Sequence, residues 1–320
     1  MRDMPKPLRL AVVGAGAMAR EHIKAFRDLP GNSVAGIWNR TRSNAELLAS
    51  EFGIPVVADS IDELYGRTRA DLAIVAVYET AINTIMKQVL AQSWAILMEK
   101  PVGLDLSDGE DIAAAAKSRE RKSSNVYVGL NRRYLSSTQA ALSDLRNDPH
   151  PRFIHVQDQQ NLEAARQIGH ADIVVRNWMY ANSIHLVDYF CAFGRGDITE
   201  VTRVAPWQPG NPGVVLAKIA FAGGDIGLYE GIWNGPGPWA CTVTTPRRRW
   251  EMRPLERASY QNAGERTLNP VEAHPWDKDF KPGLRLQAQR VAEAVYGDAP
   301  AVTLDEGLRT MRLIEAIYAH

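Results

Sequence analysis

The sequence is poor in cysteine, has no excess of either charge and contains no long apolar run. Its 320 residues include two cysteines, Cys191 and Cys241. Because neither lies in a CxxC or Cys/His cluster, we expect a reducing, cytoplasmic setting, no disulfide framework and no metal. The 37 basic and 37 acidic residues cancel to a formal charge of zero, which supplies no global field for nucleic acid or an anionic membrane. No apolar run approaches the ~18 residues of a transmembrane helix.

The first 125 residues alternate short apolar segments with amphipathic ones. This pattern is typical of βαβ units and predicts an α/β fold of the Rossmann type, with a doubly wound parallel sheet, over residues 1–125. The expected strands are 8–13, 34–38, 56–58, 71–78, 95–98 and 125–130, and the expected helices are 19–29, 43–52, 61–65, 81–92 and 106–118.

Residues 126–320 are expected to form a second, α+β domain for substrate binding and oligomerisation. Its strand-like segments follow one another through short Gly/Pro turns, which indicates an open, mostly antiparallel sheet. We expect the C-terminal helix, about residues 303–318, to pack back on the first domain. The expected strands are 153–160, 198–205, 214–221, 226–233, 240–244 and 249–253, with helices at 181–193, 283–296 and 304–318.

A glycine motif directly follows the first strand. The run Gly14-Ala15-Gly16-Ala17-Met18-Ala19 matches the G-x-G-x-x-G/A fingerprint of dinucleotide binding, in the strand–turn–helix context that the motif requires. Gly14 permits the tight turn, Gly16 lets a pyrophosphate approach backbone N–H groups, and Ala19 allows close helix–strand packing. The same stretch imitates a secretory signal peptide, but the glycine spacing favours the dinucleotide site.

The residues after the second strand bear on the choice between NADP and NAD. An acidic residue ~20 positions after the motif would bind the ribose hydroxyls of NAD. Asn39 stands there instead, followed by Arg40, Thr41 and Arg42. This run can accept the 2′-phosphate that an acid would repel, so we expect NADP, with NAD as the alternative if the arginines are solvated loop charges. Tyr78, at the end of the third strong strand, is a further candidate cofactor contact.

Three further segments complete a recognisable pattern. Glu99-Lys100-Pro101 ends an expected strand, at the edge where open α/β sheets bind ligands. The run Asn131-Arg132-Arg133-Tyr134 follows the next strand, and His185 and Asp188 lie on a helix of the second domain. Together with the glycine motif, these segments resemble the Gfo/Idh/MocA oxidoreductase family, over nearly the whole chain.

The resemblance implies a Rossmann domain with an open antiparallel-sheet domain, and oxidation or reduction of sugar-like alcohols. It places Glu99 and Lys100 in the cofactor site, with Lys100 also on the reacting hydroxyl, and it makes His185 the group that takes or gives the hydroxyl proton. These roles agree with the chemistry, since imidazole titrates near neutral pH and an ammonium stabilises a developing alkoxide. A core histidine on an apolar helix face is the alternative for His185.

One position departs from the family pattern. Most members carry an aspartate four residues before the histidine, whereas this chain has Ala181. The carboxylate that would orient or charge the imidazole is therefore missing. Asn182 could hydrogen-bond the imidazole instead, and Asp188 is expected to pack or cap within the helix. The departure fits a branch with different chemistry, such as sugar-nucleotide or keto-sugar reduction, or a member that has lost catalysis.

Several residues of the second domain are candidates for substrate contact. Arg132 matches a family position near substrate, and Gln159 points to one face of its strand with a second glutamine. Asn182 belongs to the same set, and Trp178 could stack on a sugar ring or fill the core. The arginine run 247–249 is expected at a solvated edge or an intersubunit contact. The resemblance also implies a homodimer or homotetramer formed through the broad face of the second-domain sheet.

The leading interpretation is an NADP-dependent, alternatively NAD-dependent, oxidoreductase. It would transfer a hydride between nicotinamide and a small carbohydrate-like or sugar-nucleotide alcohol or ketone. Two alternatives remain, a non-catalytic NAD(P)-binding sensor and an NAD-dependent glycosidase that oxidises its substrate transiently. Net cofactor turnover would indicate the oxidoreductase, and cofactor binding without turnover would indicate the sensor. A tightly held cofactor that is recycled would indicate the glycosidase.

Overall fold

The structure, a computed structural model, describes residues 6–118, 125–209, 213–297 and 300–319. The chain divides into two compact units. The first comprises Met1–Asn131 and Asp279–Leu308, and the second Arg132–Lys278 and Arg309–His320. The first unit therefore extends past the expected boundary at residue 125, because the strand Val126–Gly129 pairs within its sheet.

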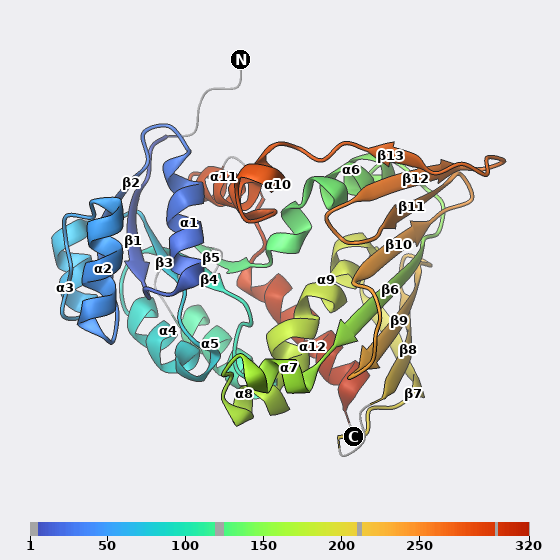
Figure 1. The fold of residues 1–320 in the computed structure, drawn as a ribbon, viewed down its shortest axis with the longest axis horizontal. Coiled ribbons are helices and arrows are strands. Elements are labelled where there is room, and N and C mark those ends of the chain that lie inside the picture. Colours follow the sequence, from blue (N-terminus) through green and yellow to red (C-terminus); the bar gives the residue numbers. More distant parts are fainter. Residues whose placement is uncertain (1–5, 119–124, 210–212, 298–299, 320) are drawn as a thin grey trace. The chain divides into compact units, whose positions relative to one another are not determined.

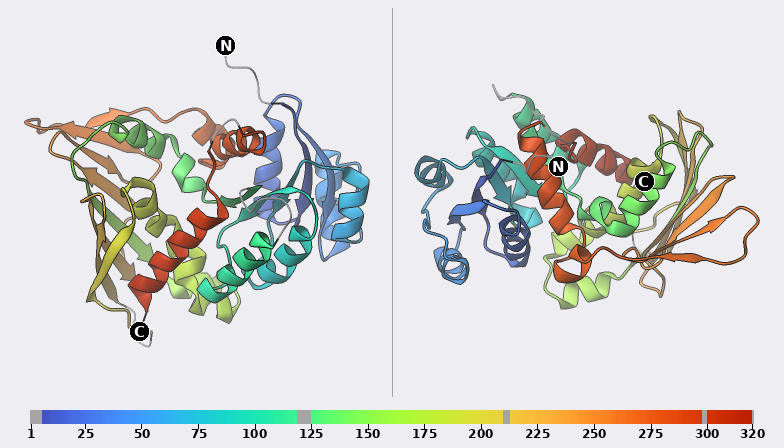
Figure 2. Two further views of the ribbon diagram at one scale, coloured as in Figure 1. Left: turned by 180° about the vertical axis from the view of Figure 1, so that it is seen from behind. Right: turned by 90° about the horizontal axis from the view of Figure 1, so that it is seen from above.

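The first unit is built on a five-stranded parallel sheet in the order β2-β1-β3-β4-β5. The strands are β1 (Arg9–Val13), β2 (Ser33–Trp38), β3 (Leu72–Val75), β4 (Ala95–Glu99) and β5 (Val126–Gly129). The helices are α1 (Ala17–Arg27), α2 (Arg42–Phe52), α3 (Ile61–Thr68), η1 (Glu79–Ala81), α4 (Ile82–Leu90), α5 (Leu106–Lys117) and α11 (Leu284–Val295). Continuously buried strands such as β3 need helices on both faces, as Figures 1 and 2 show. The expected doubly wound sheet is confirmed.

Helix α11 comes from far along the chain and packs on α1, within the first unit. Arg285 Nε donates to Asp28 Oδ2 at 2.5 Å, and the Tyr296 hydroxyl donates to the Pro7 carbonyl at 3.2 Å. The apolar face of α11 joins the core that β1, β2 and β3 share with α1. A segment made late in the sequence thus completes the core of the first unit.

The C-terminal helix α12 (Leu304–Tyr318) begins in the first unit and ends in the second. In its first turn a Cβ added to Gly307 would lie 2.9 Å from the side chains of Val102 and Val128. The first turn of α12 therefore packs on the first unit, whereas the helix from Arg309 onward belongs to the second unit.

The second unit is built on an eight-stranded sheet in the order β13-β12-β11-β10-β6-β9-β8-β7. All neighbours are antiparallel except β6 and β9, which are parallel, so the mostly antiparallel sheet is confirmed. The strands are β6 (Phe153–Gln160), β7 (Ile198–Ala205), β8 (Val214–Phe221), β9 (Ile226–Trp233), β10 (Ala240–Thr244), β11 (Arg248–Met252), β12 (Ala258–Asn262) and β13 (Asn269–Val271). The helices are α6 (Ser136–Leu145), α7 (Leu162–Gln167), α8 (Asp172–Arg176), η4 (Met179–Ser183), α9 (Ile184–Phe193) and α10 (Trp276–Asp279).

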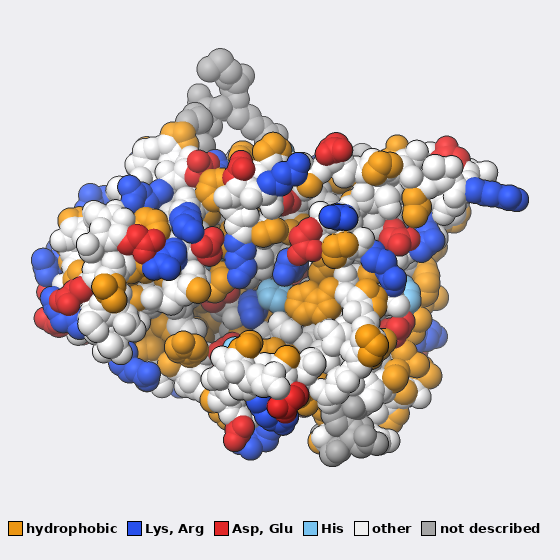
Figure 3. Space-filling view, viewed as in Figure 1, with side chains coloured by type: hydrophobic (Ala, Val, Ile, Leu, Met, Phe, Trp, Pro, Cys, Tyr) orange, Lys and Arg blue, Asp and Glu red, His pale blue; other side chains and the backbone are white. Residues whose placement is uncertain are grey.

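One face of this sheet is covered and the other is open. Buried residues alternate with more exposed ones along β6 and β9. On the buried face α9 packs closely, because a Cβ added to Gly227 would come within 2.7 Å of the Phe190 ring. Figures 1 and 2 show α6 and α9 on this face and, among the described residues, no helix of the unit on the other. Phe153 on β6, Val214 on β8 and Ile226 on β9 are exposed. Hydrophobic side chains gather at the right margin of Figure 3, where this sheet lies.

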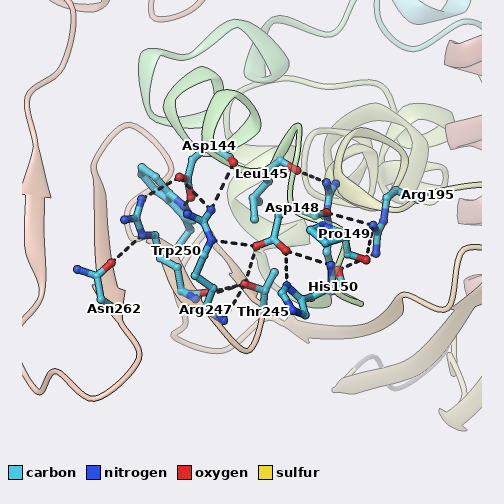
Figure 4. A network of polar contacts seen from close by, with 12 residues as sticks. Asp144, Leu145, Asp148, Pro149, His150, Arg195, Thr245, Arg247, Trp250 and Asn262 are labelled. Atoms are coloured by element: carbon cyan, nitrogen blue, oxygen red, sulfur yellow. Dashed lines mark hydrogen bonds and ion pairs between the residues drawn. The ribbon is translucent and has the colours of Figure 1, made fainter.

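A polar network ties the end of α6 to the turn between β10 and β11 (Figure 4). Asp148, whose side chain is fully buried, accepts hydrogen bonds from Thr245 Oγ1 at 3.0 Å and Arg247 Nε at 3.3 Å. Asp144 accepts one from Arg248 Nη1 at 2.8 Å. In the arginine run, expected at a solvated edge or between subunits, Arg247 and Arg249 are exposed, and all three arginines make ion pairs within the chain.

Two expected elements are shorter than the sequence suggested. The strand expected at 56–58 is reduced to a single bridge between Val57 and Ile37. The strand expected at 71–78 ends at Val75, because a short 3-10 turn, η1, leads into α4. Both cysteines are free thiols. Within the described ranges, none of the helices has the length and apolar character needed to cross a membrane.

Candidate functional site

The glycine motif forms the turn between β1 and α1. Gly14 has φ of 110°, and a Cβ there would lie 2.0 Å from the Ala76 carbonyl oxygen. Only glycine therefore allows the chain after β1 to approach the chain after β3 so closely. The strand order reverses between β1 and β3, and open α/β sheets bind ligands in the crevice at such a point.

The first turn of α1 presents bare backbone to open space. Gly16 is the N-cap of α1, and no side chain caps this end of the helix. A Cβ added to Gly16 would meet no described atom within 4 Å. Unsatisfied N–H groups and the helix dipole favour an anion at this position. At the start of α1, Ala17 is exposed, Met18 is half-buried against the core, and Ala19 is buried in it. These residues fit the pyrophosphate of a nicotinamide dinucleotide.

The loop after β2 carries the residues that are expected to select between NADP and NAD. Asn39 Oδ1 accepts a hydrogen bond from Ala15 N at 3.2 Å, and its amide donates to the Thr41 carbonyl at 2.9 Å. The Arg42 guanidinium is held by Asp59 and by Glu46.

Arg40, by contrast, is exposed, and no hydrogen bond is found for it among the described residues. Arg40 is thus the arginine of this loop that remains available to a phosphate. Tyr78, after β3, is 76% exposed and open to a ligand.

Glu99 and Lys100 stand at the carboxyl end of β4, the same edge of the sheet as the glycine motif. Glu99 is buried, and its Oε1 lies 2.5 Å from Nε2 of His22 in α1. Burial alone would raise the pKa of Glu99. The hydrogen bond from His22 and the positive charges of Lys100 and Lys281 outweigh it, and the pKa lies below its ordinary value. Glu99 is therefore an anion next to the half-buried Lys100.

Two members of this site were missed by the sequence reasoning. His22 lies on the buried face of α1, three residues after the glycine motif, where a polar residue among apolar ones was the available signal. Lys281 belongs to no motif, and its Nζ lies 3.0 Å from Met18 Sδ at the start of α1. A lysine at this position adds positive charge beside the proposed pyrophosphate site.

In the second unit, three predicted residues meet around Trp239. The His185 ring, 9% exposed on α9, lies 6.1 Å from the Trp239 ring, centroid to centroid. The Arg132 guanidinium lies 5.7 Å from the same ring centroid, and its Nη1 donates to Glu256 at 2.5 Å. Trp239 Nε1 donates to the Gln159 carbonyl at 2.7 Å. Trp239 and Glu256 were not singled out from the sequence.

Trp178 and Asn182 belong to a neighbouring buried network. Trp178 Nε1 and Asn182 Nδ2 both donate to Gln160 Oε1, at 2.8 and 2.7 Å. Gln160 Nε2 in turn donates to Asp158 Oδ1 at 2.5 Å, and burial raises the pKa of Asp158. This arrangement fits the core alternative for Trp178, which is 9% exposed.

The helix that carries His185 begins differently from a regular helix. Residues Met179–Ser183 form a π turn, η4, before α9 starts at Ile184. Ala181 is buried in this turn. Asp188 accepts hydrogen bonds from Nε and Nη2 of Arg133 and from Thr310 Oγ1, all at 2.7 Å. Asp188, expected to pack or cap within its helix, therefore binds side chains from two other elements. The predicted site residues fall into two sets, one in each unit.

Comparison with known proteins agrees with the glycine-motif half of this site. Residues 8–127 match the model of an oxidoreductase family with an NAD-binding Rossmann fold. Glucose-6-phosphate 3-dehydrogenase of Bacillus subtilis is 28% identical over 128 residues, which cover 40% of this chain and 35% of that protein. The matched segment spans about a third of the length of the first curated relatives.

Solved structures share the fold over almost the whole chain. Aldose-aldose oxidoreductase from Caulobacter crescentus is 18% identical, with a TM-score of 0.79 over 98% of this chain and 96% of that one. A levoglucosan dehydrogenase in complex with NADH is 14% identical, with a TM-score of 0.80 over 98% and 96%. At these identities the likeness shows the fold. The resemblance seen in the motifs is confirmed over the first unit: residues 8–127 match the model of the Gfo/Idh/MocA oxidoreductase family, with an NAD-binding Rossmann fold.

Proposed function

We propose that this chain is a nicotinamide-dependent oxidoreductase acting on CH–OH groups. It transfers a hydride between NADP, or alternatively NAD, and a sugar-like or sugar-nucleotide alcohol or the corresponding ketone. One observation carries the proposal. The uncapped N-terminus of α1 and the Lys100 segment beside the anionic Glu99 lie at the same edge of one parallel sheet. The edge therefore offers both an anion-binding helix N-terminus for the dinucleotide and the Lys100 ammonium for the reacting oxygen.

The site residues of the first unit bind the cofactor and the substrate oxygen in this proposal. The backbone of residues 14–17 binds the pyrophosphate, and the bound nicotinamide supplies or accepts the hydride. Lys100 binds the substrate oxygen through its ammonium group. As the hydroxyl loses its proton, negative charge develops on that oxygen, and an ammonium held in place stabilises it without reorganisation.

In the second unit, His185 carries the proton. Its imidazole takes the hydroxyl proton during oxidation and returns it during reduction. A group with the ordinary imidazole pKa of ~6.5 can do both near neutral pH. Trp239 beside it offers an aromatic face to a sugar ring, and Arg132, held by Glu256, offers donors to hydroxyl groups.

The cofactor loop favours NADP within this proposal. Asn39 replaces the acid that would repel a 2′-phosphate, and Arg40 is the loop arginine without a carboxylate partner among the described residues. NAD stays the alternative, because one solved relative of the same fold holds NADH.

The function is tested by turnover with both cofactors over a panel of sugars, sugar alcohols, keto-sugars and sugar nucleotides, followed at the nicotinamide absorbance. We expect stoichiometric cofactor conversion with at least one of them. Lys100→Met removes the ammonium at similar size. It should lower kcat by about 100-fold or more and leave NADPH affinity within a few-fold. Activity within a few-fold of the unmodified protein would refute the role of Lys100.

Two other outcomes of the turnover panel would favour the sensor or the glycosidase. Tight cofactor binding with no turnover on any panel member would indicate the sensor, which Ala181 in place of the family aspartate favours. Glycoside cleavage with a tightly held cofactor and no net absorbance change would indicate the glycosidase.

The open face of the second-unit sheet is our proposed site of self-association. It exposes Phe153, Val214 and Ile226 and is broad enough to be covered by the same face of a second copy. A twofold contact of this kind gives a homodimer, and a further contact would give a homotetramer.

A further inference from the structure

A second pocket is formed by residues that all belong to the second unit. Its volume is about 410 Å³, which is the size of many small-molecule sites. It is lined from α7, α8, η4, the loop after β7, the end of β9 and the end of α12. None of the residues to which the proposed function gives a task lines this cavity, which we call the aromatic pocket.

Three packed aromatic rings form part of its lining. Trp207 follows β7, Trp233 ends β9 and Tyr318 ends α12. The Trp207 ring centroid lies 4.5 Å from that of Trp233 and 5.4 Å from that of Tyr318. The three side chains hold one another in place, so this surface exists before any ligand arrives. Val175 of α8 and Met179 of η4 add apolar surface, and the pocket therefore suits a flat apolar ring.

Several polar side chains of the aromatic pocket already have partners within the chain. The Tyr180 hydroxyl donates to Glu315, and the Tyr318 hydroxyl lies 2.6 Å from that of Tyr229. Asn177 Nδ2 donates to a backbone carbonyl of α8 at 3.0 Å. The many hydroxyl groups of a sugar would have to compete with these bonds, whereas an aromatic ring needs no hydrogen-bond partner.

Two arginines give the aromatic pocket a positive charge. Arg166 of α7 and Arg176 of α8 are exposed, and Glu315 is the one carboxylate among the described lining residues. Arg166 Nη1 lies 3.7 Å from Glu163 Oε2, an ion pair between exposed side chains. For Arg176, no hydrogen bond or ion pair is found among the described residues. Its planar guanidinium can donate two parallel hydrogen bonds to a carboxylate.

We propose that the aromatic pocket binds a small aromatic carboxylate. The ring packs against Trp207 and Trp233, and the carboxylate accepts hydrogen bonds from Arg176, with Arg166 as the second cation. The positive charge would also suit a sugar acid, but the occupied polar groups favour the aromatic one. The site goes beyond the proposed function and does not depend on it.

Binding is measured by isothermal titration calorimetry on the full chain without cofactor, with 2-naphthoate as the probe. We expect one site per chain and a Kd below about 1 mM, because both the ring and the charge are recognised. The neutral isostere 2-naphthamide tests the charge, and acetate and glucuronate test the ring. Each should bind at least about tenfold more weakly, through loss of a charged hydrogen bond or of apolar contact.

Matched variants locate the probe. Arg176→Gln should weaken 2-naphthoate binding about tenfold and leave 2-naphthamide binding nearly unchanged. Arg266→Gln, at an exposed arginine of the same unit that does not line the pocket, makes the same change in net charge and should have no effect. Leu162→Trp, at a half-buried lining residue, should fill the space and abolish binding.

Absence of 2-naphthoate binding would overturn the proposal, as would affinities that stay within about twofold in Arg176→Gln and Leu162→Trp. Equal affinity for 2-naphthamide, or tighter binding of glucuronate, would also overturn it. If Leu162→Trp does not fold, the exposed change Arg176→Gln decides alone. Displacement of the probe by NADPH, with no effect of Arg176→Gln, would place the probe elsewhere and refute the site. Turnover plays no part in these measurements, so failure of the proposed function would leave their result unchanged.

Discussion

At the scale of single residues, Arg40 and Arg42 are two positions apart but have different surroundings. Arg42 is held by Glu46 and Asp59, whereas no hydrogen bond is found for Arg40 within the described residues. Arg40→Ala should therefore weaken NADPH binding about tenfold, the effect of one charged hydrogen bond, and leave NADH binding nearly unchanged. Fluorescence titration of both reduced cofactors measures the difference.

Arg42→Ala is the matched control for the same change in net charge. Its guanidinium already serves two carboxylates, so its loss should weaken NADPH binding less than the loss of Arg40. If the unmodified protein binds NADH as tightly as NADPH, the preference for NADP is wrong.

His185 is the second residue whose role can be measured directly. His185→Asn should abolish most turnover and remove the inflection assignable to an imidazole from the pH profile of kcat/KM. Ala181→Asp places a carboxylate one turn before the imidazole. An anion stabilises the imidazolium, so the same inflection should move to higher pH. Ala181 is buried in the π turn, and we expect this variant to be less stable as well.

Near-normal activity of His185→Asn with an unchanged profile would show that another group carries the proton. Tyr180 would be the next candidate, although its hydroxyl already donates to Glu315. Lys100 would follow.

The sequence predicted those site residues that obey a spacing rule. The glycines, Lys100 and His185 stand at fixed places relative to a strand end or a helix, so local pattern was enough to single them out. Trp239 and Lys281 lie outside regular elements and reach their sites only through the folded chain. No periodicity marks such residues.

At the scale of elements, apolar periodicity predicted the strands that are buried on at least one face. It missed the edge strand β13 (Asn269–Val271) and its neighbour β12 (Ala258–Asn262), which are largely half-exposed and so lack a clear alternation. It also missed the ten-residue helix α6 and the helices α7 and α8, each of which is shorter than two turns. The π turn before α9 could not be predicted either, because its residues read as a continuation of the helix.

The carboxylate of Asp148 joins α6 to the β10–β11 turn, and it makes the stability of the second unit depend on pH. Burial raises its pKa, but hydrogen bonds from His150, Thr245 and Arg247 more than compensate, and the pKa lies well below the ordinary value. A lowered folded-state pKa stabilises the protein above the unfolded pKa of ~3.9. This contribution is lost as the pH falls through the folded-state value.

Asp148→Asn should therefore lower the free energy of unfolding at pH 7 by about 3 kcal/mol, as for breaking a buried ion pair. The difference from the unmodified protein should be constant above pH ~5 and shrink below pH ~4, as measured by urea unfolding. Asp197→Asn, an exposed change, should stay within about 0.5 kcal/mol. A pH-independent difference would show that Asp148 acts by shape rather than by charge.

At the scale of the whole molecule, the open sheet face predicts the assembly state. Sedimentation should give two or four times the chain mass of 35.5 kDa. Phe153 pairs with Ile226 across β6 and β9, and both are exposed. Phe153→Asp/Ile226→Asp should shift the protein to monomers, because charges would be buried in the contact.

Leu47→Asp, on exposed α2 of the first unit, introduces the same charge elsewhere and should leave the assembly unchanged. A monomeric unmodified protein at micromolar concentration would contradict the proposed contact.

The return of the chain to its first unit has a consequence for biosynthesis. A ribosome delivers all five strands of the parallel sheet, then the whole of residues 132–278, and only afterwards the helix that covers α1. Until then the nascent sheet exposes the apolar strip that Leu284, Ala288 and Val291 later cover. A fragment ending at residue 131 should therefore aggregate or stay partly unfolded and bind NADPH weakly, as solubility and fluorescence would show. The core of the first unit therefore closes only after the intervening residues 132–278 have been made.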